Sequence, residues 1–115
     1  MKLKITRDQE QKKGLLGGNK GIEFTLKCQA DLTSEEKDLV KKAKIGEYKL
    51  TTYRPHEDGM ELSLTVDDII NGVSSRVKNV QKLLKLEDEI VHGCQNLKSL
   101  LEVIGSFGGE EIIEI

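Results

Sequence analysis

The sequence predicts an α+β domain, with a mostly antiparallel sheet of about five or six strands and one short and one long helix packed on one face. Apolar residues recur at helical spacing throughout 79–104, which is long enough for about seven helical turns. Several shorter runs alternate apolar and polar residues, as half-buried strands do. The length of 115 residues suits a single domain, 1–115, with one hydrophobic core.

Two antiparallel strands are predicted at the start of the chain. Residues 1–7 and 22–32 both alternate, with Leu3 on the apolar side of the first run and Leu26 on that of the second. The segment 8–21 between them is polar, basic and rich in glycine. It is long for a hairpin loop, so either the strands extend into it as a protruding ribbon or it forms a mobile loop.

A short helix is predicted over 33–45. Thr33, followed three residues later by Glu36, is a capping box, in which each side chain bonds an otherwise unpaired backbone amide. Acidic residues come early and lysines late, which complements the helix dipole, and Gly46 provides the end of the helix. Its late lysines therefore already have a structural explanation.

A second hairpin and a further short strand are predicted between the two helices. Alternating runs over 48–53 and 60–66 flank a turn-forming segment, which is the pattern of a hairpin. Residues 67–71 are expected to form a single helical turn ended by Gly72, because glycine weakens a helix interior. Alternation resumes over 73–78 and predicts another strand.

The long helix is predicted to begin after its cap, Asn79, and to end at Ile104. Its apolar stripe consists of Leu83, Ile90, Leu97 and Ile104 on one row and Val80, Cys94 and Leu101 on the next. Only Glu87 interrupts the stripe. Leu86 and Leu100 extend this apolar stripe onto the solvent-exposed margin of the helix, which favours a subunit contact.

A last strand is predicted over 110–115, after a glycine-containing turn at 105–109. It consists of three glutamates and three isoleucines. Such an acidic strand suits the edge of a sheet, where charge discourages open-ended strand pairing, or a pairing across a dimer.

The net charge of −2 is unevenly distributed along the chain. Residues 1–54 carry 13 basic and 8 acidic side chains, a net +5, whereas 55–115 carry 5 and 12, a net −7. This asymmetry indicates either a basic surface that meets an anion, or two halves that attract each other within the fold or across a symmetric dimer. No apolar run reaches the roughly 18 residues of a membrane span, and 1–8 lacks the pattern of a secretory signal, so a cytoplasmic location is expected.

The candidate ligand-binding residues are all basic. Lys12, Lys13 and Lys20 belong to the glycine-rich segment, and Arg54 and Arg76 lie by predicted strands, so that together they would bind a small anion such as a nucleotide. The alternative interpretations are a flexible connection and an exposed strand face. The segment lacks the Gly-Lys-Ser/Thr of a nucleotide-hydrolysing phosphate loop. The slight net acidity and the aromatic content of 3% argue against nucleic-acid binding.

No catalytic residue, metal site or cofactor is predicted. Cys28 and Cys94 fall in apolar patterns, as small buried residues do. The chain has two histidines and two cysteines, and a Cys/His zinc site would need every one of them to converge. The one catalytic alternative is a small hydrolase or transferase that uses the His-Glu-Asp turn at 56–58.

Residues 32–37 (LTSEEK), 43–48 (AKIGEY) and 107–111 (FGGEE) resemble small uncharacterised accessory proteins of bacteria, phages and other mobile elements. The resemblance implies a protein that binds and neutralises something, such as a host defence protein or a nucleotide signal, and it assigns no functional residue. We expect a non-enzymatic interaction protein that forms a homo-oligomer and sequesters or inhibits a partner protein. The alternative is a module that binds a small nucleotide-like anion.

Overall fold

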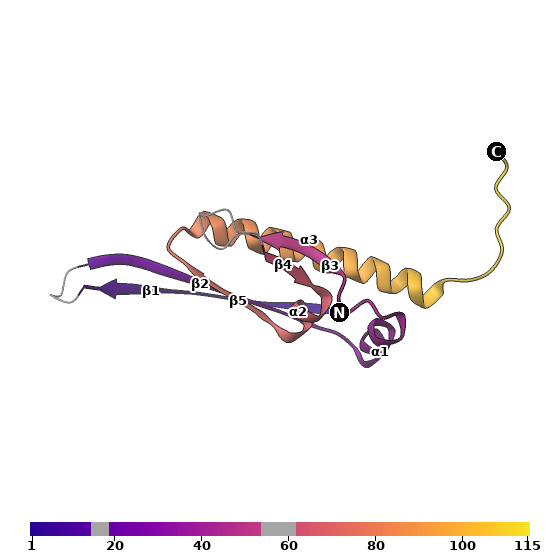
Figure 1. Cartoon of the computed structure of the whole chain (residues 1–115), viewed down its shortest axis with the longest axis horizontal. Coiled ribbons are helices and arrows are strands. Elements are labelled where there is room, and N and C mark those ends of the chain that lie inside the picture. Colours follow the sequence, from indigo (N-terminus) through magenta and orange to yellow (C-terminus); the bar gives the residue numbers. More distant parts are fainter. Residues whose placement is uncertain (15–18, 54–61) are drawn as a thin grey trace.

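The computed structural model describes residues 1–14, 19–53 and 62–115. In chain order its elements are β1 (Lys2–Lys13), β2 (Asn19–Asp31), α1 (Ser34–Ala43), β3 (Lys49–Tyr53), β4 (Leu62–Thr65), α2 (Val66–Asn71), β5 (Val73–Val77) and α3 (Val80–Ser106) (Figure 1). The described residues thus confirm the α+β class and the antiparallel pairing that the sequence predicts.

The described strands form two sheets rather than one. β1, β2 and β5 make a three-stranded sheet in that order, and β3 pairs with β4 in a separate two-stranded sheet. The predicted single sheet of about five or six strands is therefore wrong for the described part of the chain. Alternation identifies each strand, but it does not specify which hairpins share hydrogen bonds, because that depends on contacts between distant segments.

β1 and β2 form a long antiparallel ribbon. Their register runs without a shift from Lys2 to Lys12, so the strands extend into 8–21, which is one of the two predicted alternatives. β5 pairs only with residues 24–28 of β2, and the outer half of the ribbon projects beyond it (Figure 1). This projection contributes to a radius of gyration of 18.6 Å, compared with about 13 Å for a compact chain of this length.

Helix α3 is the central packing element. It contacts β2 and β5 of the three-stranded sheet, β3 of the two-stranded sheet, and α1. Ile90, in the middle of the helix, is fully buried. The helix passes close to β3 at Gly93, where an added Cβ would lie 3.2 Å from the Cβ of Leu50. The long helix therefore packs against both sheets and does not simply cover one face of a single sheet.

Caps start all three helices. Thr33 and Glu36 form the predicted capping box of α1, and α2 begins with a second such box after Thr65. The side chain of Asn79 accepts a hydrogen bond at the start of α3, as predicted. α1 ends two residues earlier than predicted because Lys44 adopts the left-handed conformation, with φ 56°.

The end of the chain differs from the prediction. α3 continues through Gly105 to Ser106, two residues beyond its predicted end. Residues 107–115 contain no strand and are exposed throughout, and they run away from the far end of α3 (Figure 1). The segment 110–115 forms no strand within the single chain, because no described strand of this chain pairs with it. The predicted edge strand is therefore absent from the sheets of this chain, and the alternative, a pairing across a dimer, stays a prediction.

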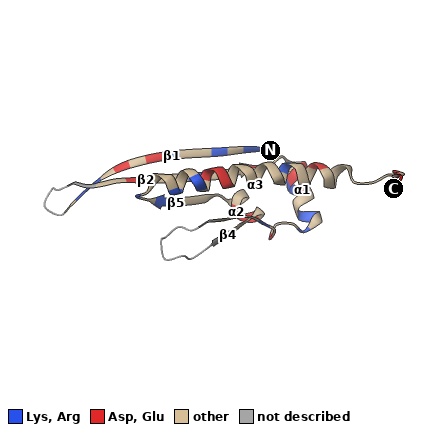
Figure 2. Cartoon of the chain, turned by 90° about the horizontal axis from the view of Figure 1, so that it is seen from above, with Lys and Arg blue, Asp and Glu red and all other residues tan. Residues whose placement is uncertain are grey.

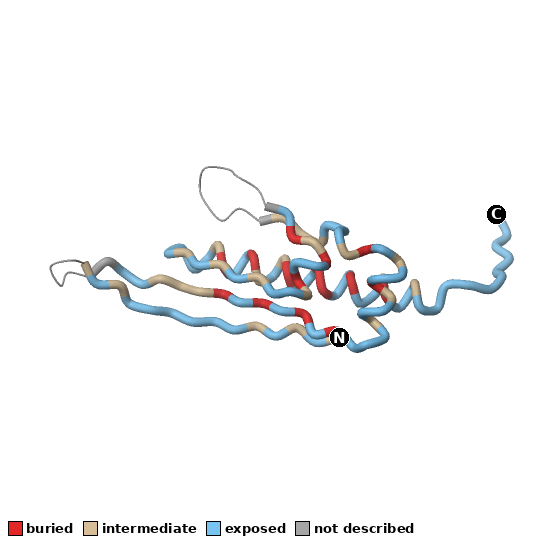
Figure 3. The backbone as a smooth tube through the Cα atoms, turned by 60° about the horizontal axis from the view of Figure 1, so that its bottom comes forward, coloured by how far each residue is buried: buried red, intermediate tan, exposed pale blue. Residues whose placement is uncertain are grey.

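The core lies between α3 on one side and residues 26–32 at the base of the ribbon, α1, β4 and α2 on the other, and Figure 3 shows buried residues on α3, along the ribbon and beyond it. Leu86 is only 4% exposed and Leu100 packs against this core, so the subunit contact inferred from these two leucines loses its support. The exposed large apolar residues of α3 are instead Val80, Leu84 and Val103. No helix in the described ranges is long and apolar enough to cross a bilayer.

Candidate functional site

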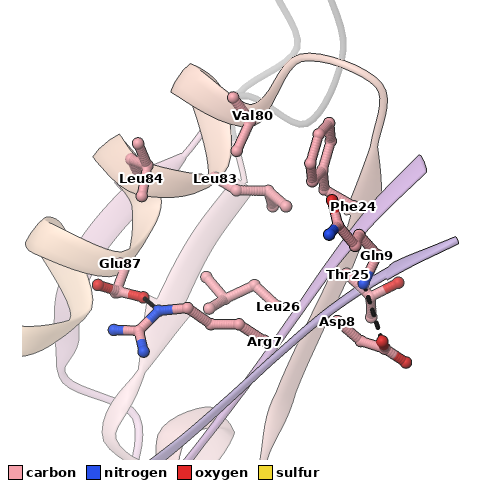
Figure 4. A pocket seen from close by; sticks show the side chains of 10 residues that line it. All are labelled: Arg7, Asp8, Gln9, Phe24, Thr25, Leu26, Val80, Leu83, Leu84 and Glu87. Carbon is pink, nitrogen blue, oxygen red and sulfur yellow. Dashed lines mark hydrogen bonds and ion pairs between the residues drawn. The ribbon is translucent and has the colours of Figure 1, made fainter. Parts of the chain in front are cut away.

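An open groove lies between the first turns of α3 and the ribbon of β1 and β2 (Figure 4). Its volume is about 320 Å³. Its apolar lining consists of Phe24 and Leu26 from β2 and Val80, Leu83 and Leu84 from α3. Polar residues of β1, including Asp8 and Gln9, border it. An apolar centre with a polar border is the usual arrangement of a protein–protein contact surface.

The secondary structure places these apolar residues on a common side. Leu83 and Leu84 come three and four residues after Val80, so the three residues share one face of α3. Phe24 and Leu26 are two residues apart and so point to the same side of β2. Because Leu84 is 51% exposed, part of this apolar surface remains in contact with water.

An ion pair borders the groove at the edge strand. Arg7 of β1 donates from Nε to Oε1 of Glu87 at 2.6 Å. This hydrogen bond holds the pKa of Glu87 below its usual range, although partial burial acts in the opposite direction. The pair explains why a carboxylate interrupts the apolar stripe of α3. Glu87 faces the ribbon as the apolar residues of the stripe do, but its carboxylate binds the guanidinium of Arg7 there.

The structure brings two of the five predicted ligand-binding residues together. Lys12 Nζ and Arg76 Nε lie 3.8 and 3.4 Å from the same oxygen, Glu23 Oε1. Lys12 also lies 3.4 Å from Glu10 Oε2. Both cations therefore already face carboxylates, which lowers the positive potential available to an anion at this place.

The other three predicted ligand residues are more dispersed or not described. Lys13 is the exposed last residue of β1. Lys20 belongs to β2, and the structure does not describe its side chain. Arg54 lies outside the described residues, as does the His-Glu-Asp turn at 56–58.

Five further lysines form a basic surface near the base of the ribbon, which we call the lysine surface. Lys2 and Lys4 of β1 and Lys37 of α1 line a hollow of about 480 Å³. Lys37, Lys41 and Lys44 line a neighbouring hollow of about 470 Å³. All five are exposed, and none forms an ion pair with another described residue. Figure 2 shows basic positions both at the start of β1 and on α1.

Sequence reasoning missed the lysine surface because each part of it has a local explanation. Lys2 and Lys4 are explained by the solvent-exposed side of a strand, and the lysines of α1 by their favourable interaction with the helix dipole. The available signal is the spacing of Lys37, Lys41 and Lys44, which places them on one side of the helix. The convergence with β1 depends on the tertiary structure.

Both cysteines are buried in the core, as the sequence predicts. Burial raises the pKa of the Cys28 thiol to about 11 and also raises that of Cys94. His92 is exposed on α3. Within the described residues, no three His, Cys, Asp or Glu side chains are grouped so that they could hold a metal ion.

No protein-family model, curated protein or solved structure matches this chain. The resemblance to accessory proteins therefore stays a prediction. The groove, the lysine surface and the exposed segment 107–115 are the features from which a function can be inferred.

Proposed function

We propose that this chain is a non-enzymatic, cytoplasmic interaction protein that acts as a homo-oligomer. The observation that carries the proposal is that a single chain exposes large apolar side chains in two separate places. One is the groove, where Val80 and Leu84 are exposed, and the other is the segment 107–115. Contiguous apolar exposure of this kind marks interaction surfaces in soluble proteins.

The segment 107–115 is the stronger of the two features. Its exposed apolar side chains are Phe107, Ile112, Ile113 and Ile115, and Phe107 is 87% exposed. Fully burying one such side chain is worth about 1.5–3 kcal/mol. An isolated copy gains none of this free energy, because the side chains stay in water. An assembly that covers the segment gains the free energy of burial once for each copy.

The proposal is tested by light scattering on the full chain over a range of micromolar concentrations. The expected mass is at least twice the 12.9 kDa of one chain, and it should decrease on dilution because association depends on protomer concentration. A single-chain mass over the whole range would contradict the proposal. The sequestering or inhibiting role predicted from the sequence would then need a monomeric mechanism.

A second candidate function is the binding of a small anion, and the lysine surface favours it. Five exposed ammonium groups line two adjoining hollows, with Lys37 shared between them. Asp31, Glu47 and Asp67 also border these hollows, so the net positive charge is smaller than the five lysines alone suggest. Phosphate groups suit such a cluster because lysine donors bind them as point charges.

This second candidate is tested by thermal unfolding with inorganic phosphate and a panel of nucleotides. A ligand that binds the native state must raise the melting temperature, and Lys37→Glu should abolish that rise. Lys42→Glu is the matched control, because Lys42 lies on the same helix but outside both hollows, paired with Asp38 at 2.8 Å. If no ligand in the panel changes the melting temperature, anion binding at this surface is wrong.

A further inference from the structure

The segment 107–115 has the pattern of a strand without a partner strand. Ile113 and Ile115 are separated by one residue, so in an extended chain they point to the same side, and Ile112 points to the other. All three isoleucines are exposed. The segment therefore offers two isoleucines on one side of an extended backbone.

The groove lies beside a free strand edge. β1 is the outer strand of the three-stranded sheet and pairs with β2 alone among the described strands. Arg7, Asp8 and Gln9 of β1 line the groove. A strand added along this edge would bond to the free backbone groups of β1 and direct every second side chain to the face of the sheet on which α3 lies.

The segment is too short to reach the groove of its own chain. Leu84 and Ser106 are 22 residues apart on one helix, which corresponds to roughly 33 Å. Ile113 is seven residues beyond Ser106, and seven extended residues span at most about 25 Å. Occupation of the groove by this segment therefore requires a second copy of the chain.

The charges of the two regions are complementary. Residues 73–86, which lead into and form the start of α3, contain Arg76, Lys78, Lys82 and Lys85 and no acidic residue. Of these, Arg76 already lies 3.4 Å from Glu23 Oε1, so the lysines carry most of the complementarity. Residues 107–115 contain Glu110, Glu111 and Glu114 and no basic residue. At the groove itself Arg7 is paired with Glu87, and Asp8 is a further acidic lining residue, so the complementary charge lies along the start of α3 and not in the groove lining.

We propose that residues 107–115 of one copy add as a strand to the free edge of β1 in a second copy, with Ile113 and Ile115 in the groove. The exchange is reciprocal in a two-fold symmetric dimer, in which antiparallel α3 helices bring the end of each near the start of the other. This inference rests on the proposed homo-oligomer and specifies the contact that holds it together.

The first test replaces the two isoleucines with acidic residues. Ile113→Glu combined with Ile115→Glu should reduce the mass measured by light scattering to that of one chain. Both positions are exposed in the single chain, so the variant should keep its fold, which circular dichroism checks. Ile112→Glu is the matched control and should keep the oligomer, because Ile112 lies on the opposite side of the added strand.

The second test is a disulfide cross-link between two different chains. A Leu84→Cys chain is mixed with an Ile113→Cys chain under mild oxidation, and the expected product is a disulfide-linked pair containing one of each. The native cysteines are buried and should not contribute. Asp31→Cys, which is exposed but does not line the groove, replaces Leu84→Cys as the control and should give no such pair.

The outcomes separate this inference from the proposed function. A wild-type chain with the mass of one chain would contradict both. A wild-type oligomer that keeps its mass in the double-glutamate variant, or that cross-links Ile113→Cys equally well to Asp31→Cys, would overturn the strand exchange and leave the oligomer to be explained by another surface.

Discussion

The β1–β2 ribbon has two halves: a base half, in which residues 2–9 pair with 24–31, and an outer half, in which 10–13 pair with 19–23. Both halves are built from the same two strands, but only the base half belongs to the core. In the base half, Leu26 and Cys28 are 4% and 2% exposed. In the outer half, the corresponding side of β1 carries Gln11, and Ile22 opposite it on β2 is 45% exposed. Figure 3 shows the change from buried to exposed residues along the ribbon.

This difference shows that alternation predicts a strand but does not predict its burial. The backbone pairing continues into the outer half, where α3 no longer covers the ribbon and the side chains become polar. An isolated two-stranded hairpin is only marginally stable in water. The outer half should therefore depend on the base half for its stability, whereas the base half should depend little on the outer half.

The largest expected effect comes from shortening one side chain in each half. Leu26→Ala should lower the free energy of unfolding by about 2–5 kcal/mol, because it removes buried apolar contacts and leaves a cavity. Ile22→Ala should lower it by less than about 0.5 kcal/mol, because its side chain is already partly exposed. Urea unfolding at one protein concentration measures both values, and equal values would contradict the division of the ribbon into two halves.

Thiol labelling gives the next largest contrast. With its pKa raised by burial from 9.0 to about 11, the Cys28 thiol has roughly 100-fold less thiolate at pH 8 than an ordinary thiol, and the thiolate is the reactive form. An Ile22→Cys variant should react with a thiol reagent at the rate of a free thiol, while Cys28 and Cys94 of the same chain should react only on unfolding. Rapid reaction of three thiols in the native variant would show that the base half is open.

The smallest expected effect concerns the ion pair between Arg7 of the ribbon and Glu87 of α3. Glu87 has a lowered pKa in the folded state because Arg7 donates a hydrogen bond to it, so its contribution to stability is present above the unfolded pKa of about 4.3 and is lost as the pH falls through the folded value. Glu87→Gln should therefore destabilise the protein slightly at pH 7, by much less than Leu26→Ala.

The difference between Glu87→Gln and the wild type should shrink as the pH falls below about 4, since the native carboxyl group is then protonated as well. Unfolding curves at a series of pH values measure this dependence. A difference that stays constant with pH would mean that Glu87 contributes through packing and not through its charge.

Much of the local structure was predictable because its signals lie within a few residues. The capping box of Thr33 and Glu36 and the cap at Asn79 appear where the sequence places them, since each needs only short-range hydrogen bonds. The segment 110–115 was predicted as a strand from an equally local signal, its three isoleucines, and it forms no strand within the single chain. A strand also needs a neighbour to pair with, which a local signal does not supply.

The candidate surfaces were much less predictable. Arg7 and Glu87 are 80 positions apart, and neither carries a motif that indicates the other. Lys12 and Arg76 were both assigned to an anion site, but they lie beside Glu23. Glu23 is diagonal to each of them in the sheet, and this placement depends on the register of β1, β2 and β5. Charge in the sequence does not show which charges are already paired.

The sequence by itself determined the α+β class, the approximate positions of the helices and of the described strands, and the burial of the two cysteines, because periodicity and capping depend on neighbouring residues. Only the tertiary structure decided that the strands divide into two sheets, that α3 packs against both, and that the groove lies beside the free edge of β1. These features depend on contacts between segments far apart in the chain, and their free energies are set by packing and pairing that no local pattern specifies.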